Sequence, residues 1–335
     1  MVLILRILAV VVTVLSIYIF APWRQAMYYL SPLPESIERQ LDESIEQGID
    51  GIIVYVDDGI NEPKLYACGI KERRTQTSAQ ENALFKMASI GKLYEALAVT
   101  KLSTMGKLSL DKTIADYLPH VADKIVNSDI ITVRMLVQHR SGLANYTDHE
   151  NFSWSEPFPN TYELILGTGS NFEPGTDYQY SNTNYFLPKQ VMSVVLGHDY
   201  KSFIEQEILT PLNLEQTYLS MAGVDLSKMM SGYHVGYEHD FKDLSQGYIA
   251  TAENVGRFIR ALNNGKAFSN EVEKQVYQSL YRSSHDGWVI GYISKTKYFK
   301  ENDTVIVQFI NTTGNDTILL ADIVFDRITK LISEN

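Results

Sequence analysis

Cysteine is almost missing from this sequence, which has a single one, Cys68, among 335 residues. One cysteine cannot form an internal disulfide, so the fold must depend on packing alone. Because free cysteine is commonly buried as a small apolar group, we interpret Cys68 as a packing residue rather than a nucleophile. The seven histidines are scattered and form neither an H-E-x-x-H motif nor a cluster with zinc spacing. We therefore expect no metal site and no organic cofactor.

Basic residues are also scarce, because 29 Lys and Arg face 40 Asp and Glu and give a formal net charge of -11. A phosphate-binding surface needs clustered Lys and Arg, so this balance argues against a nucleic-acid partner. The contents of 45% hydrophobic and 21% charged residues are those of an ordinary globular protein. The sequence has no internal repeat and no low-complexity linker, and we expect it to be folded throughout.

One apolar run, residues 2–20, is near the length of about 20 residues that crosses a bilayer. The residues after it lack the small-x-small pattern of a cleavage site, and Trp23 suits a membrane interface. We favour an uncleaved anchor in residues 1–24 and leave a cleaved signal segment open. Arg6 and Arg24 flank the run almost symmetrically, so the positive-inside rule does not set its orientation.

Patterns along residues 25–335 predict one domain with two lobes. A sheet lobe is expected over about 35–107 and 248–335, and a helix-rich lobe over about 108–247. The expected strands are 51–59, its hairpin partner 64–68, and the β-rich runs 288–294, 297–300 and 304–311. The expected helices include 34–47, 89–105 with Gly106 as its stop, 252–262 and an amphipathic one over 318–332.

The segment Ser89-Ile90-Gly91-Lys92 has the spacing of a nucleophile beside a base. Positions i and i+3 of a helix share one face at about 5–6 Å between Cβ atoms, so the lysine amine can reach the serine oxygen. A serine hydroxyl is a weak nucleophile until a neighbour takes its proton. The apolar neighbours of this segment favour the burial that would let a lysine do so.

The same S-x-x-K spacing also occurs from Ser109 to Lys112 and from Ser294 to Lys297. Taken alone, each of the three is most simply a serine at a helix start followed by a solvated lysine. The spacing by itself therefore does not select a nucleophile.

A longer ordered pattern selects Ser89. Residues 85–92 (FKMASIGK), 108–119 (LSLDKTIADYLP) and 131–143 (ITVRMLVQHRSGL) occur in the order of motifs in one family. Over roughly residues 50–330 the chain resembles the serine β-lactamases, penicillin-binding proteins and related esterases, including the class C enzymes. The resemblance implies an α+β fold of the β-lactamase/transpeptidase type, an antiparallel sheet flanked by helices with a second helix-rich lobe. The active site would lie between the lobes, with Ser89 as nucleophile and Lys92 as its base.

Residues 172–185 (FEPGTDYQYSNTNY) resemble the family's Pro-Gly turn and Tyr-x-Asn motif. By resemblance Tyr180 is catalytic, because a phenol can shuttle a proton where a cation such as Lys92 favours its phenolate form. Asn182 would donate its amide to a substrate carbonyl and orient Lys92. The alternative is that Tyr180 is one of 21 tyrosines that pack a lobe interface.

The family's third motif, K/H-x-G, has two candidates, which begin at His234 and at His285. Residues 247–254 (GYIATAEN) resemble the segment that precedes this motif, so His285, Asp286 and Gly287 are assigned to substrate binding. By the same resemblance the backbone N–H groups of Ser89 and Trp288 would form an oxyanion hole.

The chain departs from the family at Asp286, where members that bind carboxylates commonly carry Thr or Ser. An aspartate would repel a substrate carboxylate by like charge, so we hypothesise a neutral or amine-bearing substrate or a poor β-lactamase. The connection from Leu262 to His285 has only 22 residues and lacks the expected Gly-rich strand, which suggests an altered pocket edge. His139 is interpreted as structural, because nothing in the sequence places it against the nucleophile.

These features together predict a serine hydrolase that forms an acyl-enzyme on an amide or ester bond. A D,D-peptidase or D-amino-acid peptidase-like activity is expected, with β-lactamase and carboxylesterase as alternatives within the family. A membrane-tethered sensor that binds peptidoglycan-like or β-lactam ligands without turnover is an alternative of another class. We expect a location in the cell envelope, anchored through the N-terminal segment with the catalytic domain on the periplasmic or extracellular side. The expected partners are a small-molecule or peptide substrate and the membrane.

Overall fold

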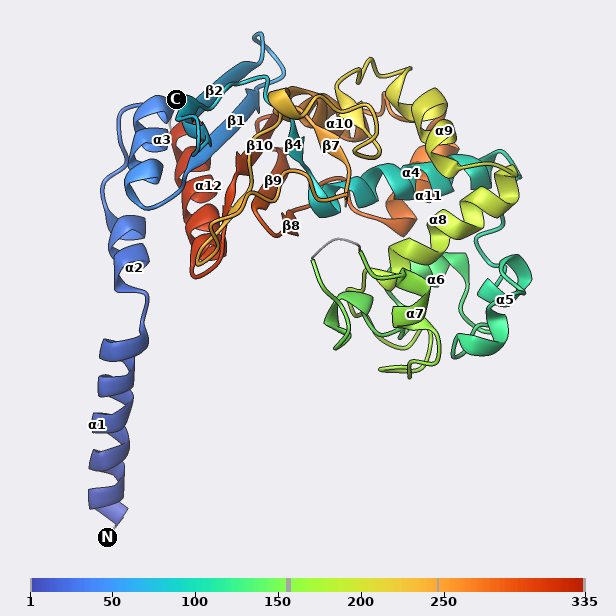
Figure 1. The fold of residues 1–335 in the computed structure, drawn as a ribbon, viewed down its shortest axis with the longest axis horizontal. Helices are drawn as coiled ribbons and strands as arrows, with labels where there is room; N and C mark the ends of the chain where they lie inside the picture. Colours follow the sequence, from blue (N-terminus) through green and yellow to red (C-terminus); the bar gives the residue numbers. More distant parts are fainter. Residues whose placement is uncertain (1, 155–157, 246, 334–335) are drawn as a thin grey trace.

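A six-stranded antiparallel sheet with the order β3-β2-β1-β10-β9-β8 forms the frame of the domain (Figure 1). The computed structural model describes residues 2–154, 158–245 and 247–333. The two ends of the domain meet in the sheet, because β1 pairs along its length with β10. The strands are β1 Gly51–Asp57, β2 Lys64–Glu72, β3 Thr77–Ser78, β8 Gly287–Val289, β9 Tyr292–Phe299 and β10 Thr304–Ile310.

Two smaller sheets join the middle of the chain to this frame. β4 Phe85–Lys86 and β5 Thr217–Tyr218 both pair with β7 Ile249–Ala250, and β6 Tyr233–His234 runs parallel to β11 Thr312–Thr313. β5 and β6 lie inside the stretch 108–247 that the sequence assigns to the helical lobe, and they pair with strands outside it. The lobe boundary near residue 247 stays a prediction.

Helices cover both faces of the sheet because its central strands are apolar on both sides. In β1, Ile52 and Val54 pack under α3 Ile37–Glu46 and α12 Thr317–Ser333, whereas Ile53 and Tyr55 belong to the larger core on the other face. This alternation is the two-residue period of a strand. α10 Ala252–Asn264 covers that second face and ends at Gly265 with φ +89°.

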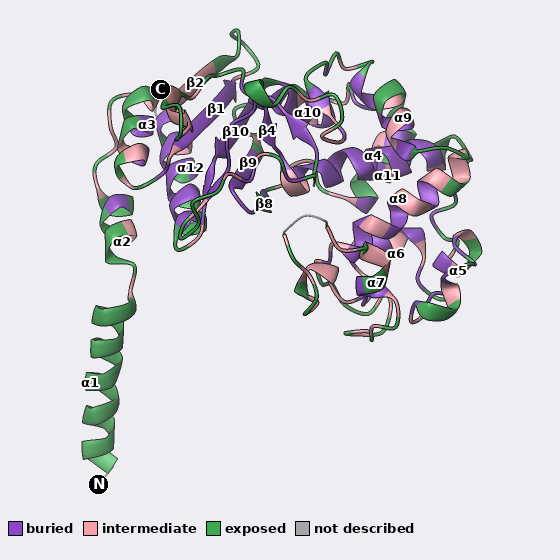
Figure 2. Cartoon of the chain, viewed as in Figure 1, coloured by how far each residue is buried: buried purple, intermediate pink, exposed green. Residues whose placement is uncertain are grey.

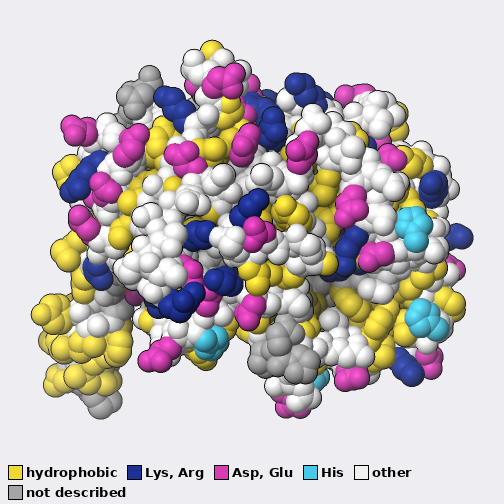
Figure 3. All heavy atoms as spheres, turned by 45° about the horizontal axis from the view of Figure 1, so that its top comes forward, with side chains coloured by type: hydrophobic (Ala, Val, Ile, Leu, Met, Phe, Trp, Pro, Cys, Tyr) yellow, Lys and Arg dark blue, Asp and Glu magenta, His cyan; other side chains and the backbone are white. Residues whose placement is uncertain are grey.

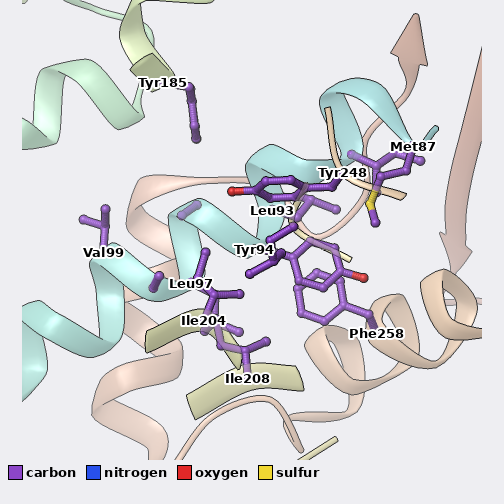
Figure 4. Packing of buried hydrophobic residues seen from close by; sticks show 14 of the residues in the cluster. Met87, Leu93, Tyr94, Leu97, Val99, Tyr185, Ile204, Ile208, Tyr248 and Phe258 are labelled. Carbon is purple, nitrogen blue, oxygen red and sulfur yellow. The ribbon is translucent and has the colours of Figure 1, made fainter. Parts of the chain in front are cut away.

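The central helix α4 Gly91–Thr104 connects the sheet to the helical part of the molecule (Figure 1). It is buried from Gly91 to Leu102, and Tyr94 stacks on Phe258 of α10 with ring centroids 3.7 Å apart (Figure 4). α8 and α11 pack against α4. The other helices here are α5 Ile114–Tyr117, α6 Val133–Val137, α7 Thr161–Ile165, α8 Thr183–Leu196, α9 Tyr200–Ile204, which continues as a π-turn over Glu205–Leu209, and α11 Glu271–Leu280. Short 3₁₀ turns cover Ala88–Ile90, Ala122–Lys124, Tyr146–Asp148 and Leu226–Lys228.

Most of the elements expected from the sequence are present, and the α+β class with an antiparallel sheet flanked by helices is confirmed. One expectation was wrong, because the runs 288–294 and 297–300 are not two strands with a turn between them. The turn lies at Ile290-Gly291, where Gly291 has φ +88°, and β9 then continues without a break from Tyr292 to Phe299.

The N-terminal segment forms the helix α1 Val2–Phe20, which has a mean hydropathy of 2.7 and no buried residue (Figure 2). It projects from the domain as an apolar rod, whereas the surface of the domain in Figure 3 mixes acidic and basic side chains. A second helix, α2 Trp23–Leu30, packs against α12. There the fully buried Arg327 donates hydrogen bonds to the carbonyl oxygens of Tyr28, Ser31 and Pro32.

Candidate active site

Ser89 and Lys92 lie where residues 85–92 lead into α4. Ala88 has φ +48°, a conformation that non-glycine residues rarely adopt, and a 3₁₀ turn over Ala88–Ile90 leads into the helix. Lys92 Nζ lies 3.0 Å from Ser89 Oγ, as the i to i+3 spacing predicts. The lysine is buried, with 8% of its surface exposed, whereas Ser89 is partly open. A hydroxyl that substrate can reach therefore has an amine from the protein interior beside it.

Tyr180 and Asn182 approach the same two groups from the helical side. The hydroxyl oxygens of Tyr180 and Ser89 lie 2.7 Å apart, and Lys92 Nζ donates to Asn182 Oδ1 over 2.9 Å. Lys92 Nζ also lies 5.2 Å from the centroid of the Tyr180 ring. The structure thus brings together the four residues that the first two motifs proposed.

His139 holds the Tyr-x-Asn segment in place. Its ring centroid lies 4.6 Å from that of Tyr180, and its Nδ1 accepts the backbone N–H of Ser181. Its carbonyl oxygen accepts the N–H of Gln179. Burial, and then the charge of Lys92, lower the pKa of His139 to about 3, so the ring is neutral. His139 is therefore packed behind Tyr180 and supports it, in agreement with its interpretation as structural.

The amide of Asn182 has partners that the sequence did not indicate. Its Nδ2 donates to Asn145 Oδ1 and to Thr147 Oγ1, and its backbone N–H donates to Asn145 Oδ1 as well. Both amide hydrogens are directed at these two residues. Of the two roles expected for Asn182, the geometry supports the orientation of Lys92 rather than donation to a substrate carbonyl.

The third motif leads into the edge strand β8, and its last residue, Gly287, is the first residue of that strand and lies directly against Met87 and Ala88. A Cβ at Gly287 would come within 2.5 Å of Met87 O and 2.3 Å of Ser294 Oγ, so only glycine permits this approach. Ser294 Oγ donates to Met87 O over 2.9 Å and ties β9 to the same carbonyl. The backbone of Trp288 is thereby brought close to that of Ser89.

His285 is partly buried beside Tyr180, with ring centroids 6.0 Å apart, and stacks on Tyr281 at 5.8 Å. Burial is the main cause that lowers the pKa of His285 to about 4, and the positive charge of Lys92 lowers it further. The hydrogen bond with the backbone of Asp286 acts in the opposite direction but is outweighed. His285 is therefore neutral at physiological pH. It can exchange hydrogen bonds with a ligand but supplies no positive charge.

Asp286 is part of an ion-pair network that the sequence did not reveal. Lys295 on β9 contacts Asp286 Oδ2 at 2.9 Å and also contacts Asp322 on α12. Burial acts to lower the pKa of Lys295, but its hydrogen bonds with Asp322 and Asp286 outweigh burial and raise the pKa. Two carboxylates share one ammonium here, so this wall of the site keeps a net negative charge.

A cavity of about 590 Å³ opens beside Ser89, and Tyr180 and His285 also line it. Ile318 and Asp322 of α12 belong to its lining as well. The remaining lining residues include Asn182, Asp286, Gly287 and Lys295, together with Asp148 and the aromatic side chains of Phe152, Trp154 and Trp288. A second hollow of about 270 Å³ is also lined by Ser89 and reaches the buried Glu95 and its ion-pair partner Lys189.

The competing candidates lie elsewhere. Ser109 is exposed, and Lys112 lies over the ring of Tyr117. Ser294 and Lys297 are three residues apart on a strand, so their side chains point to opposite faces of the sheet.

His234 and Cys68, which the sequence analysis also considered, do not line the cavity beside Ser89. His234 lies on β6 and contacts Thr313 at 2.9 Å, away from the residues that line the cavity. Cys68 is partly buried on β2 beside Asp42, and burial followed by this carboxylate raises the pKa of its thiol to about 11. The thiol is therefore protonated, and protonated thiols are poor nucleophiles.

Comparisons with known proteins agree with this geometry. Penicillin-binding protein 4 of Amycolatopsis lactamdurans is 27% identical over 168 residues, which cover 50% of this chain and 43% of that protein. Protein flp of Staphylococcus aureus is 24% identical over 265 residues, 74% of this chain and 52% of that protein. The chain thus spans about half the length of these curated relatives.

Among solved structures, a D-amino acid amidase from Ochrobactrum anthropi SV3, complexed with L-phenylalanine amide, superposes with a TM-score of 0.77. It is 20% identical, and the match covers 89% of this chain and 97% of the amidase, which shows a shared fold. The Beta-lactamase family matches residues 35–287, which include Ser89, Lys92, Tyr180 and the whole third motif. The chain belongs to the Beta-lactamase family.

Proposed function

We propose that this protein is a serine hydrolase that works through an acyl-enzyme on Ser89. The observation that carries the proposal is the position of Ser89 Oγ, which lies 3.0 Å from Lys92 Nζ and 2.7 Å from Tyr180 Oη in the lining of a cavity. Both neighbours can exchange protons with a hydroxyl. A hydroxyl so placed can lose its proton as it attacks a carbonyl carbon.

The reaction proceeds in two halves. In the first, Ser89 Oγ attacks the carbonyl carbon of an amide or ester, and its proton passes through Lys92 and Tyr180 to the leaving nitrogen or oxygen. The backbone N–H groups of Ser89 and Trp288 stabilise the negative oxygen that forms in between. In the second half water attacks the ester on Ser89, Lys92 and Tyr180 take one proton from that water, and they deliver it to Ser89 Oγ as the acid is released.

The charges of the cavity favour a neutral or amine-bearing substrate. Asp286 and Asp322 outnumber Lys295, and Asp148 adds a further carboxylate to the lining. Like charge would repel a substrate carboxylate, whereas a substrate ammonium would be attracted. A D-amino-acid peptidase or amidase-like activity agrees with these charges, and the shared fold with a D-amino acid amidase is compatible with it. β-Lactamase and carboxylesterase activities are the alternatives within the family.

The same proposal places the enzyme at a membrane of the cell envelope. The 19 residues of α1 span about 28 Å as a helix, which matches the hydrocarbon core of a bilayer at about 30 Å. Trp23 follows at the position where an interfacial aromatic residue is expected. We propose that α1 anchors the chain and that the catalytic domain faces the periplasm or the cell exterior, where peptidoglycan peptides are found.

The test is a hydrolysis panel with the full chain in detergent micelles. It compares a D-amino acid amide with a free ammonium, a neutral aryl ester, a penicillin, and a peptide that ends in D-Ala-D-Ala. We expect Ser89-dependent turnover of the first two at kcat/KM values at least tenfold above those of the last two. Turnover that is unchanged in Ser89→Ala, or no turnover of any of the four, would contradict the proposal.

A further inference from the structure

The apolar helix α1 leaves the domain at the end of the molecule where α12 begins (Figure 1). Gln25 Nε2, early in α2, lies 3.2 Å from Asp316 Oδ2, just before α12 starts. Farther along both helices, Arg327 of α12 donates to the carbonyl oxygens of Tyr28 and Ser31. α2 therefore runs beside α12 in the same direction, and α1, which precedes α2, lies beyond the N-terminal end of α12.

That end of α12 is also a wall of the catalytic cavity. Ile318 and Asp322 lie one helical turn apart and both line the cavity with Ser89. The side chains at the start of the helix are apolar and open to solvent, since Ile318 is 54% exposed and Leu319 is 40% exposed. The anchor and one edge of the cavity thus lie at the same end of the domain.

The distance along the chain from α1 to this edge is short. Gln25, which contacts Asp316, is the fifth residue after Phe20, the end of α1. Helical residues rise about 1.5 Å each, and the two non-helical residues Ala21 and Pro22 rise at most about 3.5 Å each, so the distance is on the order of 8–12 Å. About 5–8 Å of polar headgroups lies outside each side of the hydrocarbon core. The first turn of α12 is therefore at the outer edge of the headgroup layer when α1 spans the bilayer.

We propose that the first turn of α12, with Ile318 and Leu319, contacts the lipid headgroup layer, so that the catalytic cavity opens at the membrane surface. The inference rests on the anchoring proposed above for α1. Its consequence for substrate is that the acyl donor is carried on a membrane-attached amphiphile, with its reactive carbonyl at headgroup level. The acidic groups nearby, Asp316 and Asp322, favour a neutral or cationic surface over an anionic one.

The test uses the full chain in phosphatidylcholine vesicles, with one environment-sensitive fluorophore on an introduced cysteine. Cys68→Ser provides the background, Leu319→Cys is the test site, and Val272→Cys is the control. Val272 is 65% exposed and lies on α11, which packs against α4. We expect the label at residue 319 to shift to shorter emission wavelengths on reconstitution and to be quenched by nitroxide headgroup lipid. The label at residue 272 should do neither.

Failure of this inference can be separated from failure of the anchor. If the chain floats with the vesicles but the label at residue 319 behaves like the one at residue 272, the cavity does not open at the membrane. If the chain does not float, the proposed anchor itself is wrong.

A second measurement needs no variant. An ester attached to a phospholipid should be cleaved at least tenfold faster in the vesicles that hold the enzyme than in separate vesicles. Equal rates in both would overturn the membrane-facing cavity, even where a soluble ester is cleaved normally.

Discussion

At the scale of single residues, the hydroxyl of Ser89 is the meeting point of groups from distant parts of the chain. Lys92 reaches it from the same helix, and Tyr180 reaches it from the loop before α8. Neither neighbour is held by Ser89 alone, since Asn182 fixes the lysine and His139 supports the tyrosine. Each role can be tested by removing one functional group while keeping the shape of the side chain.

Tyr180→Phe removes only the hydroxyl that contacts Ser89. General acid and base groups typically contribute about 10²-fold to 10⁴-fold to a rate, so we expect kcat on an aryl ester to fall by that factor. The unfolding midpoint should stay close to that of the wild type, because the ring still packs on His139. The measurement is steady-state hydrolysis with thermal unfolding as its control. A rate within threefold of the wild type would remove Tyr180 from the proton path.

Asp286→Thr tests the charge of the cavity wall. Without this carboxylate, Lys295 pairs with Asp322 alone among the residues that the structure describes, and the net negative charge of this ion-pair group disappears. We expect kcat/KM for a carboxylate-bearing penicillin to rise about tenfold and that for an amine-bearing amide to fall. The ratio of the two constants is the readout, because a general loss of activity leaves it unchanged. If the wild type already hydrolyses penicillin efficiently and the ratio does not move, the charge argument fails.

The two buried histidines near the site make stability depend on pH. The pKa of His139 is about 3 and that of His285 about 4 in the folded chain, both below the ordinary value of 6.5. Between pH 6.5 and these lower pKa values, the unfolded chain therefore binds more protons than the folded chain. The free energy of unfolding accordingly falls as the pH drops below about 6.5. Each histidine contributes a slope of up to about 1.4 kcal/mol per pH unit in its window.

His139→Asn should reduce that slope. Asparagine tolerates the φ of +56° at this position, and its Oδ1 can replace Nδ1 as acceptor for the N–H of Ser181. Urea unfolding at pH 7, 6, 5 and 4.5 measures the slope in the variant and the wild type. Identical slopes would show that His139 has an ordinary pKa in the folded chain.

Site residues that belong to a local sequence motif could be predicted from the sequence. Site residues that are related only through contacts between distant segments of the chain could not. Ser89, Lys92 and Tyr180 come from ordered motifs, and their mutual contacts are present. Lys295 and Asp322 come from β9 and α12, and no spacing relates them to Asp286 before the fold is known. Asn145 and Thr147 likewise come shortly after the motif at residues 131–143, but nothing in the sequence indicates that they contact Asn182.

At the scale of elements, the edge strand β8 depends on one missing side chain. Gly287→Ala would place a methyl group within 2.5 Å of Met87 O, a backbone atom that cannot move freely. We expect β8 to shift away from Ser89, with a loss of at least 100-fold in kcat and a cost of about 1–3 kcal/mol in stability. Gly169→Ala is the matched control, since its Cβ would meet nothing within 4 Å. Full activity in Gly287→Ala would contradict the close approach of β8.

Elements were predictable where capping and periodicity agree. α10 begins after Thr251, whose side chain accepts the N–H of Asn254, and it ends at Gly265. α11 was not expected between Leu262 and His285, although Asn270 caps it by accepting the N–H of Glu273. The turn at Gly291 was missed as well, because a two-residue turn leaves an apolar run almost unbroken.

At the scale of the whole molecule, two features stand out: the six-stranded sheet and the packing of α2 against α12. The first and last parts of the domain share one sheet, and α4 extends from it between the sheet and the helical part (Figure 1). Arg327 and Gln25 join α2 to α12 by hydrogen bonds, so α2 connects the apolar helix α1 to the domain. The contacts between α2 and α12 lie outside the motifs of the family. The sequence predicted the apolar run that precedes α2 but not these contacts.

The central claim, that Ser89 is the nucleophile, is tested most directly by intact-mass spectrometry of the full chain after treatment with a fluorophosphonate. We expect one adduct per chain in the wild type, in Ser109→Ala and in Cys68→Ser, and none in Ser89→Ala. An adduct that persists in Ser89→Ala, or no adduct on the wild type, would contradict the account.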